Sequence, residues 1–442
     1  MRNPNSVTQT PVTQTPVTHH LPGLVVTNHY FQLPLDYANK DSNRITIFAR
    51  EVVAAGNEKS DLPFMVYFQG GPGSGSPRPN DNSGWIKRVL KEYRLLLLDQ
   101  RGTGQSTPIT AQTLRRFATA QAQADYLKHF RADNIINDAE AIREQLIGDQ
   151  SWSIIGQSFG GFCVLRYLSA APHHVKEALI TGGIPSLTRP AEDVYRATYK
   201  RVAEKNRLFY QRYPEDAQRV SEIVRHLRSH DVRLPSGGRL TAQRFQQLGL
   251  NFGMSDGFEN IHYLLEEAFV EGASGREINW NFLFHFEKMQ SFDTNPIFSL
   301  LHEAIYAQKS ATRWAAERVL DEYPEFEPNQ SGTVLFTGEM IYPWMFDEYG
   351  QLQPLKAAAE LIADFEDWPM LYDVARLSQN SVPTAAAVYF DDMYVHREFS
   401  EETARIVPNL KLWITNQYEH NGLRADGEAI VDRLLKMVRG EL

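Results

Sequence analysis

One serine of this sequence stands between glycines in a pattern that suits nucleophilic chemistry. Gly156-Gln157-Ser158-Phe159-Gly160 fits the pattern G-x-S-x-G, with an apolar run before it and an apolar, helix-like run after it. Glycines are needed on both sides because the serine backbone is strained and neighbouring segments pack close to it. Ser158 is therefore the candidate nucleophile, and the backbone N–H of Phe159 is a candidate donor to an oxyanion. Without the surrounding apolar runs, such a serine would more often lie in an ordinary loop.

A serine hydroxyl reacts efficiently only when a base takes its proton and a third group holds that base. For G-x-S-x-G between a strand and a helix, the expected chain order is serine, acid, histidine. Of the 13 histidines, only His396 and His420 follow the last strand-like segments. His420 lies in the loop after the apolar run 412–415, where a histidine can turn back toward Ser158. We therefore expect His420 to be the base; the alternative is a solvated loop side chain.

An aspartate pair follows the strand-like segment 384–390 and supplies the candidate acid. Asp391 and Asp392 are both possible on spacing alone. We favour Asp392, because Asp391 directly continues the strand, whereas Asp392 begins a turn that can direct its carboxylate toward His420. The remaining aspartate would then cap a turn or a helix.

A glycine-rich loop, Gln69 to Gly73, follows the apolar run 64–68. Its backbone can approach a substrate closely, so we expect the N–H of Gly71 to be the second oxyanion donor. Read alone, a Gly-Gly-Pro-Gly segment is more often only a turn. The loop lacks the G-x-x-x-x-G-K-[ST] frame of a phosphate-binding loop, which disfavours nucleotide binding.

The elements that must position these residues are short apolar runs separated by glycine-rich turns and helical stretches. This alternation is typical of buried parallel strands with helical crossovers. Strand-like runs occupy residues 24–28, 44–52, 64–68, 94–98, 152–155, 178–181, 384–390 and 412–415. Apolar residues at helical spacing over 135–146 and the stretch 427–438 predict helices. The expected fold class is α/β, with a mostly parallel central sheet and flanking helices.

The chain divides into three kinds of segment. Residues 1–20 contain Val-Thr-Gln-Thr-Pro twice, and we expect a disordered N-terminal tail. Residues 191–375 carry long amphipathic stretches with few β-branched runs, which predicts a purely helical cap. This cap would be inserted into one α/β domain made of residues 21–190 and 376–442.

Composition excludes several classes of partner. The 442 residues carry a formal net charge of −9, with no basic field for a phosphate backbone, so we expect no nucleic-acid partner. Cys163 is the single cysteine, which rules out an intrachain disulfide and fits a reducing compartment. No apolar run approaches the roughly 20 residues that span a membrane, and the N-terminus lacks a secretory signal. We expect a cytoplasmic protein without a membrane partner.

Together these motifs resemble the proline iminopeptidases, α/β-hydrolase serine peptidases that release an N-terminal proline. The resemblance rests on four segments: Gly70 to Gly73, Asp99 to Gly104 as D-Q-R-G-T-G, Gly156 to Gly161, and the C-terminal Asp and His. The chain length resembles the larger, long-capped branch of that family. One departure is Gln69, which stands where the family usually has histidine. The resemblance implies that Ser158, His420 and Asp392 act through an acyl-enzyme, with no metal and no organic cofactor.

The same resemblance implies how the substrate is bound. In that family, glutamates of the cap bind the free amino end of a small peptide, and a small apolar pocket holds the proline ring. Glu339 is the first candidate because its neighbours are aromatic and apolar; Glu266 and Glu259 are further candidates. For any of the three, the alternative is a solvated helix face.

Two rival functions remain open on sequence grounds. An esterase or amidase of the same fold would share the serine machinery, because fold and triad do not determine specificity. A catalytically inactive relative that binds a ligand would keep the fold alone. An epoxide or dehalogenase chemistry is disfavoured, because it uses a carboxylate where this chain has Ser158.

Overall fold

A nine-stranded sheet forms the centre of the protein. The structure, a computed structural model, describes residues 16–273, 275–328 and 332–442. The strands are β1 (Val17–Leu21), β2 (Leu24–Pro34), β3 (Arg44–Ala54), β4 (Phe64–Phe68), β5 (Arg94–Asp99), β6 (Trp152–Gln157), β7 (Val175–Thr181), β10 (Thr384–Tyr389) and β11 (Leu410–Thr415). Their order across the sheet is β1-β2-β3-β5-β4-β6-β7-β10-β11.

The sheet is antiparallel at one side and parallel across the rest. Antiparallel pairing joins β1 to β2, β2 to β3 and β3 to β5. All pairs from β5 to β11 are parallel. The parallel strands other than the edge strand β11 are mostly apolar and buried, because helices cover both of their faces. The predicted α/β class with a mostly parallel sheet is confirmed.

Helices cover the two faces of the sheet with separate apolar cores. The helices are α1 (Gly84–Val89), α4 (Ala132–Ile147), α5 (Phe159–Ala170), α16 (Arg397–Ile406) and α17 (Gly422–Arg439). Helices α1 and α17 pack over one face, with Leu95, Leu97 and Ile430 in their core. On the other face, α4 and α5 share a core that continues without a break into the region 191–375.

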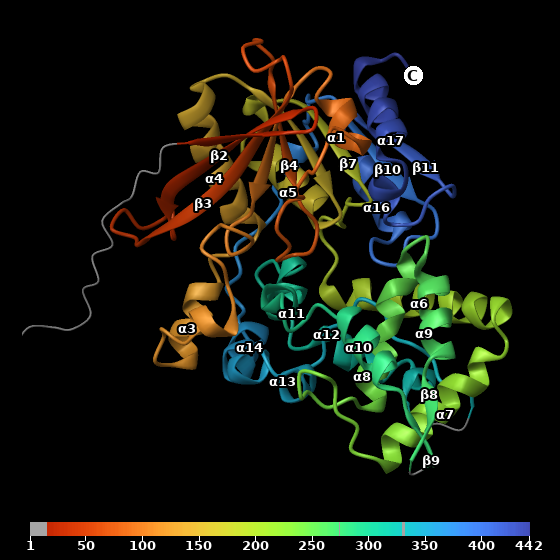
Figure 1. Cartoon of the computed structure of the whole chain (residues 1–442). Helices are drawn as coiled ribbons and strands as arrows, with labels where there is room; N and C mark the ends of the chain where they lie inside the picture. The colour runs from red at the N-terminus through yellow and green to blue at the C-terminus, as the bar shows by residue number, and fades with distance from the viewer. Residues whose placement is uncertain (1–15, 274, 329–331) are drawn as a thin grey trace, which may run out of the picture.

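The region 191–375 lies against one end of the sheet and is mainly helical (Figure 1). Its helices are α6 (Ala191–Arg212), α7 (Asp216–Ser229), α8 (Ala242–Gln246), α9 (Gly257–Glu266), α10 (Trp280–Lys288), α11 (Pro296–Leu301), α12 (Ala315–Leu320), α13 (Met345–Glu348), α14 (Lys356–Ala363) and α15 (Val374–Leu377). A hairpin of β8 (Phe269–Gly272) and β9 (Gly275–Ile278) corrects the expectation of a purely helical cap. These strands are short and largely exposed, so they lack the buried apolar alternation that identifies a strand in sequence.

The N-terminal boundary also differs from the prediction. The expected tail over 1–20 falls mostly on residues outside the described ranges, but Val17–Leu21 pairs with β2 as an edge strand. Its side chains are exposed, so backbone pairing rather than burial places it in the sheet.

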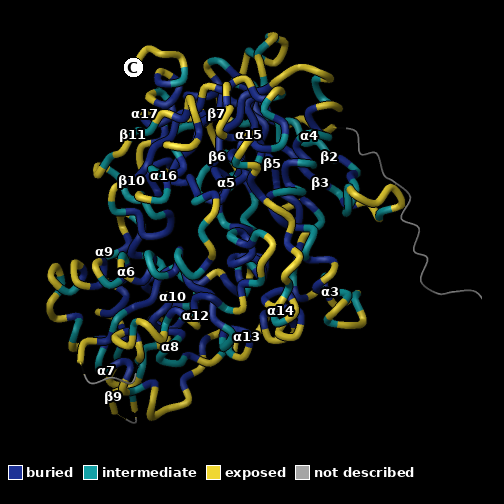
Figure 2. The backbone as a smooth tube through the Cα atoms, turned by 180° about the vertical axis from the view of Figure 1, so that it is seen from behind, coloured by how far each residue is buried: buried dark blue, intermediate teal, exposed yellow. Residues whose placement is uncertain are grey.

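Burial follows these layers, with the central strands β4 to β7 and β10 mostly dark blue in Figure 2 and exposed residues on outer helices and loops. Within the described ranges, no helix combines the length and apolarity that crossing a bilayer requires.

Candidate active site

Ser158 occupies a sharp turn between β6 and α5. Its backbone has φ 55° and ψ −125°, outside the regions that L-residues prefer, and it directly precedes the first residue of α5. A Cβ on Gly156 would overlap the carbonyl oxygen of Gly160, and one on Gly160 would overlap that of Phe68. The flanking glycines are therefore required by close packing of backbone against backbone, as the G-x-S-x-G pattern predicts.

The glycine-rich loop after β4 lies directly against this turn. A Cβ on Gly70 would come within 2.9 Å of the Cβ of Ser158. Phe159 is the first residue of α5, so its N–H has no acceptor within the helix. Gly71 has φ 131°, a conformation open to glycine. The loop that carries Gly71 thus packs against the Ser158 turn, and Phe159 directly follows the nucleophile.

The departure at Gln69 leaves the loop well anchored. The Tyr67 hydroxyl donates to Gln69 Oε1 at 2.6 Å, and Gln100 Nε2 donates to the Gln69 carbonyl at 3.0 Å. Gln69 therefore holds the start of the loop from both its side chain and its backbone.

His420 and Asp392 form a buried pair. His420 Nδ1 lies 2.8 Å from Asp392 Oδ2, and the two side chains are 6% and 1% exposed. The other Asp392 oxygen accepts the N–H groups of Tyr394 and Val395 at 2.9 and 3.1 Å. Asp391 instead forms an ion pair with Arg201. The structure therefore joins Asp392, and not its neighbour, to His420.

Two adjacent glycines after β7 pack closely against His420 and against the Ser158 backbone. A Cβ on Gly182 would lie 3.1 Å from His420 Nδ1, and a Cβ on Gly183 would overlap the Ser158 carbonyl oxygen. In addition, the Ser158 N–H donates to the Thr181 carbonyl at 2.9 Å. The glycine pair itself was the signal in the sequence from which this close approach could have been predicted.

Nearby carboxylates favour the protonated form of His420. Burial opposes the imidazolium, but Asp392, Glu339 and Glu419 together raise the pKa of His420 above its ordinary value. This environment stabilises the imidazolium that forms when the histidine takes a proton from serine.

Glu339 lies close enough to His420 and Asp392 to interact with them electrostatically. Burial raises the pKa of Glu339 to about 7; His420 opposes this shift and Asp392 adds to it. His302 Nε2 lies 3.9 Å from Glu339 Oε2, and burial lowers the pKa of His302 to about 3, so this imidazole is neutral. Glu339 is therefore a partly buried carboxylate, 16% exposed, whose contact with His302 brings no positive charge.

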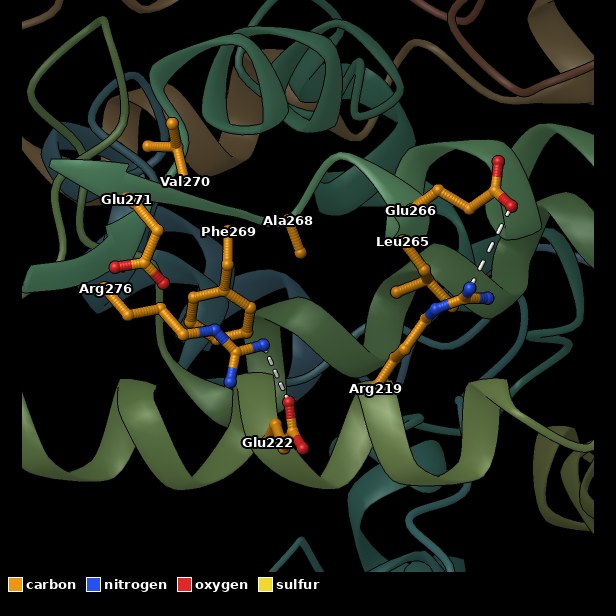
Figure 3. A pocket seen from close by; sticks show the side chains of 9 residues that line it. All are labelled: Arg219, Glu222, Leu265, Glu266, Ala268, Phe269, Val270, Glu271 and Arg276. Carbon is orange, nitrogen blue, oxygen red and sulfur yellow. Dashed lines mark hydrogen bonds and ion pairs between the residues drawn. The ribbon is translucent and has the colours of Figure 1, made fainter.

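The structure does not bring the other two candidate glutamates to this site. Glu259 pairs with Arg212 at 2.6 Å and accepts the Tyr213 hydroxyl at 3.1 Å. Glu266 points toward Arg219 beside a pocket between α7, α9 and the β8–β9 hairpin (Figure 3). Both carboxylates already pair with arginines of the cap, whereas the histidine that contacts Glu339 is neutral.

Similarity to known proteins identifies the family of this chain. The family described as alpha/beta hydrolase fold matches residues 63–284. A proline iminopeptidase of Aeromonas sobria is 51% identical over 420 residues, covering 95% of this chain and 98% of that protein. A proline iminopeptidase of Aspergillus aculeatus is 37% identical over 438 residues, covering 95% of each chain. A proline iminopeptidase of Neisseria meningitidis serogroup B is 29% identical over 131 residues, covering 30% of this chain and 35% of that protein.

Two of these relatives match along nearly the whole chain, including the cap, at well above 30% identity. The chain belongs to the proline iminopeptidase family of α/β-hydrolases.

Proposed function

We propose that this protein is a serine exopeptidase that releases N-terminal proline from small peptides through an acyl-enzyme. Family membership supports the reaction class. The observation that carries the choice over an esterase is Glu339, a largely buried carboxylate, 16% exposed, close to the His420–Asp392 pair. A carboxylate is costly to bury without a partner, so such a group is explained when the ligand itself brings a cation.

In the proposed reaction, Ser158 attacks the carbonyl carbon of the N-terminal prolyl residue. His420 takes the serine proton, and Asp392 holds the imidazole and stabilises its charged form. The N–H groups of Phe159 and Gly71 stabilise the oxyanion of the tetrahedral intermediate. His420 then gives its proton to the leaving amine, and water activated by the same histidine releases proline and restores Ser158.

Glu339 is assigned to the free amino end of the substrate. A prolyl amine is protonated near neutral pH and needs a paired negative charge when it leaves water. The ammonium in turn favours the ionised form of Glu339. Substrate binding therefore lowers the pKa of this carboxyl from the value of about 7 to which burial raises it.

The region 191–375 acts in this proposal as a cap that admits chain ends. It contributes Glu339, and its Asn295 donates to the Pro72 carbonyl of the glycine-rich loop at 3.4 Å. A helical cap on the reaction centre favours small peptides over internal bonds of folded proteins. The single cysteine, Cys163, is buried and fits a cytoplasmic location.

The decisive experiment is release of p-nitroaniline from proline, alanine and N-acetylproline p-nitroanilides by the wild type and by Ser158→Ala. We expect activity on free proline anilide that disappears on acetylation of the amine and on loss of Ser158. Hydrolysis of a p-nitrophenyl ester with all three anilides inert would support the esterase alternative. A folded protein that a fluorophosphonate does not label would indicate an inactive relative.

A further inference from the structure

The loop that carries His420 is bound by the cap at three consecutive residues. Glu419 accepts a hydrogen bond from Lys205 Nζ at 2.6 Å. The His420 N–H donates to the Gly253 carbonyl at 3.1 Å. Asn421 accepts the Ser255 N–H at 3.1 Å and donates to the Ser255 hydroxyl at 3.0 Å.

Lys205 is the charged member of these contacts. It lies on α6, the helix with which the cap begins, and its side chain is only 4% exposed. Lysine is almost never fully buried unless it is paired, because removing its charge from water is costly. Its partner Glu419 immediately precedes His420 in the chain. The ion pair therefore joins helix α6 of the cap to the loop that carries His420, the proposed general base.

Glu419 depends on this lysine for its charge. One of its oxygens accepts from Lys205, and the other is buried without a hydrogen-bond partner among the described residues. Burial raises the pKa of Glu419, and Lys205 opposes that shift. Without the lysine, a partly buried carboxylate, 29% exposed, would stand unpaired beside His420.

We propose that Lys205 is a positioning residue for His420, acting through Glu419: the pair holds the histidine loop against the cap and sets the net charge beside the imidazole. This proposal rests on the function proposed above. The cap thereby takes part in the organisation of the triad as well as in substrate binding. A purely structural pair would hold the loop without changing the ionisation of His420.

The ionisation of His420 distinguishes the two roles. The acidic groups that face it are Asp392 from the loop after β10, Glu339 from the cap and Glu419 from its own loop. The rings of Tyr394 and Tyr389 lie at 4.6 and 6.5 Å from its ring centroid. Of these three carboxylates, Glu419 is the one that pairs with Lys205. Variants of this pair therefore change the contribution of Glu419 to the electrostatic potential at His420 and leave those of Asp392 and Glu339 unchanged.

The test measures the rate at which a fluorophosphonate labels Ser158 as a function of pH. This probe has no amino group, so it reports on His420 whether or not the enzyme accepts prolyl peptides. Glu419→Gln removes a negative charge and leaves the positive charge of Lys205, so the acid-side midpoint should fall by about 0.5 pH unit or more. In Lys205→Met/Glu419→Gln both charges are absent, and the midpoint should return toward that of the wild type.

Rates add a second criterion. Lys205→Met leaves Glu419 unpaired and should lower the labelling rate about tenfold or more. The double variant should recover much of this loss, because the unpaired carboxylate is gone. Lys205→Arg keeps the charge and should label at close to the wild-type rate. Lys200→Met, an exposed lysine on the same helix, is the matched control and should change nothing.

An unchanged acid-side midpoint in Glu419→Gln would overturn the proposal, as would a double variant whose loss of labelling rate is the sum of the two single losses. If Lys205→Met does not fold, Glu419→Gln and Lys205→Arg still decide. Wild-type enzyme that labels readily but leaves proline p-nitroanilide intact would refute the proposed peptidase function alone, because the labelling profile still tests the Lys205–Glu419 pair.

Discussion

His420 Nδ1 lies 2.8 Å from Asp392 Oδ2, whereas the neighbouring Asp391 is turned away toward Arg201. Two adjacent aspartates thus have opposite environments. Asp392 is 1% exposed and also accepts two backbone N–H groups, and Asp391 is 46% exposed. This contrast provides a matched pair of variants.

Asp392→Asn should lower kcat for proline p-nitroanilide by about 10³-fold or more, because an amide can neither hold the required tautomer of His420 nor stabilise the imidazolium. Asp391→Asn should change kcat less than about threefold, since it alters only a half-exposed ion pair. Steady-state kinetics of the two variants provide the measurement. Equal losses in both would contradict the assignment of the acid.

The activity of the wild type should depend on two ionisations at acid pH. As pH falls through about 7, Glu339 gains a proton and loses the charge that holds the substrate ammonium. His420, whose pKa the neighbouring carboxylates raise above its ordinary value, also becomes protonated on the acid side and can no longer act as a base. For proline p-nitroanilide, the acid limb of log kcat/KM against pH should approach a slope of two. A p-nitrophenyl ester without an amine should give a slope of one, and Glu339→Gln should give one for both substrates.

Identical acid limbs for the anilide and the ester in the wild type would exclude Glu339 as the amino-end ligand. Glu266→Gln provides the control. Glu266 is paired within the cap, so this variant should leave the acid limbs of the pH profiles for both substrates unchanged.

Glu339→Gln should also stabilise the protein at alkaline pH. The folded pKa of Glu339 is about 7, against an ordinary value of 4.5. The folded state therefore binds this proton more tightly, and the contribution of Glu339 to stability decreases as pH rises from about 4.5 through 7. Thermal unfolding at pH 8 should show a gain of about 2 kcal/mol for the variant. The gain should vanish near pH 4, and a gain that does not depend on pH would point to another cause.

Gly160→Ala should be strongly destabilising. The new Cβ would overlap the Phe68 carbonyl oxygen, which is backbone and cannot move aside without disturbing β4. We expect a loss of about 3 kcal/mol in the free energy of unfolding, with less fluorophosphonate-labelled protein. Gly350→Ala is the control, since Gly350 is exposed and a Cβ there meets nothing within 4 Å. Equal stability of the two variants in urea unfolding would refute the packing argument.

The sequence by itself determined the parallel part of the sheet and the turn that holds Ser158. Strands β4 to β7 and β10 are short apolar runs bounded by turn residues, and G-x-S-x-G follows one of them. These are local signals: burial on both faces leaves a continuous apolar run, and a strained turn requires glycine. The family resemblance rested on the same segments, and the comparisons bear it out.

The tertiary structure decided which of several equivalent residues meet. Asp391 and Asp392 differ by one position, and Glu259, Glu266 and Glu339 are all acidic residues of the cap. Their environments differ because arginines from distant segments pair with Asp391, Glu259 and Glu266. Long-range contacts of this kind leave no periodic pattern in the chain.

The same reason explains the contacts between the cap and the His420 loop. Lys205 and Glu419 are 214 residues apart, and Gly253 reaches His420 only through its carbonyl oxygen. Neither residue type nor spacing predicts contacts between residues so far apart in the chain. These contacts form because the core of the cap and the core over one face of the sheet pack into one continuous hydrophobic core.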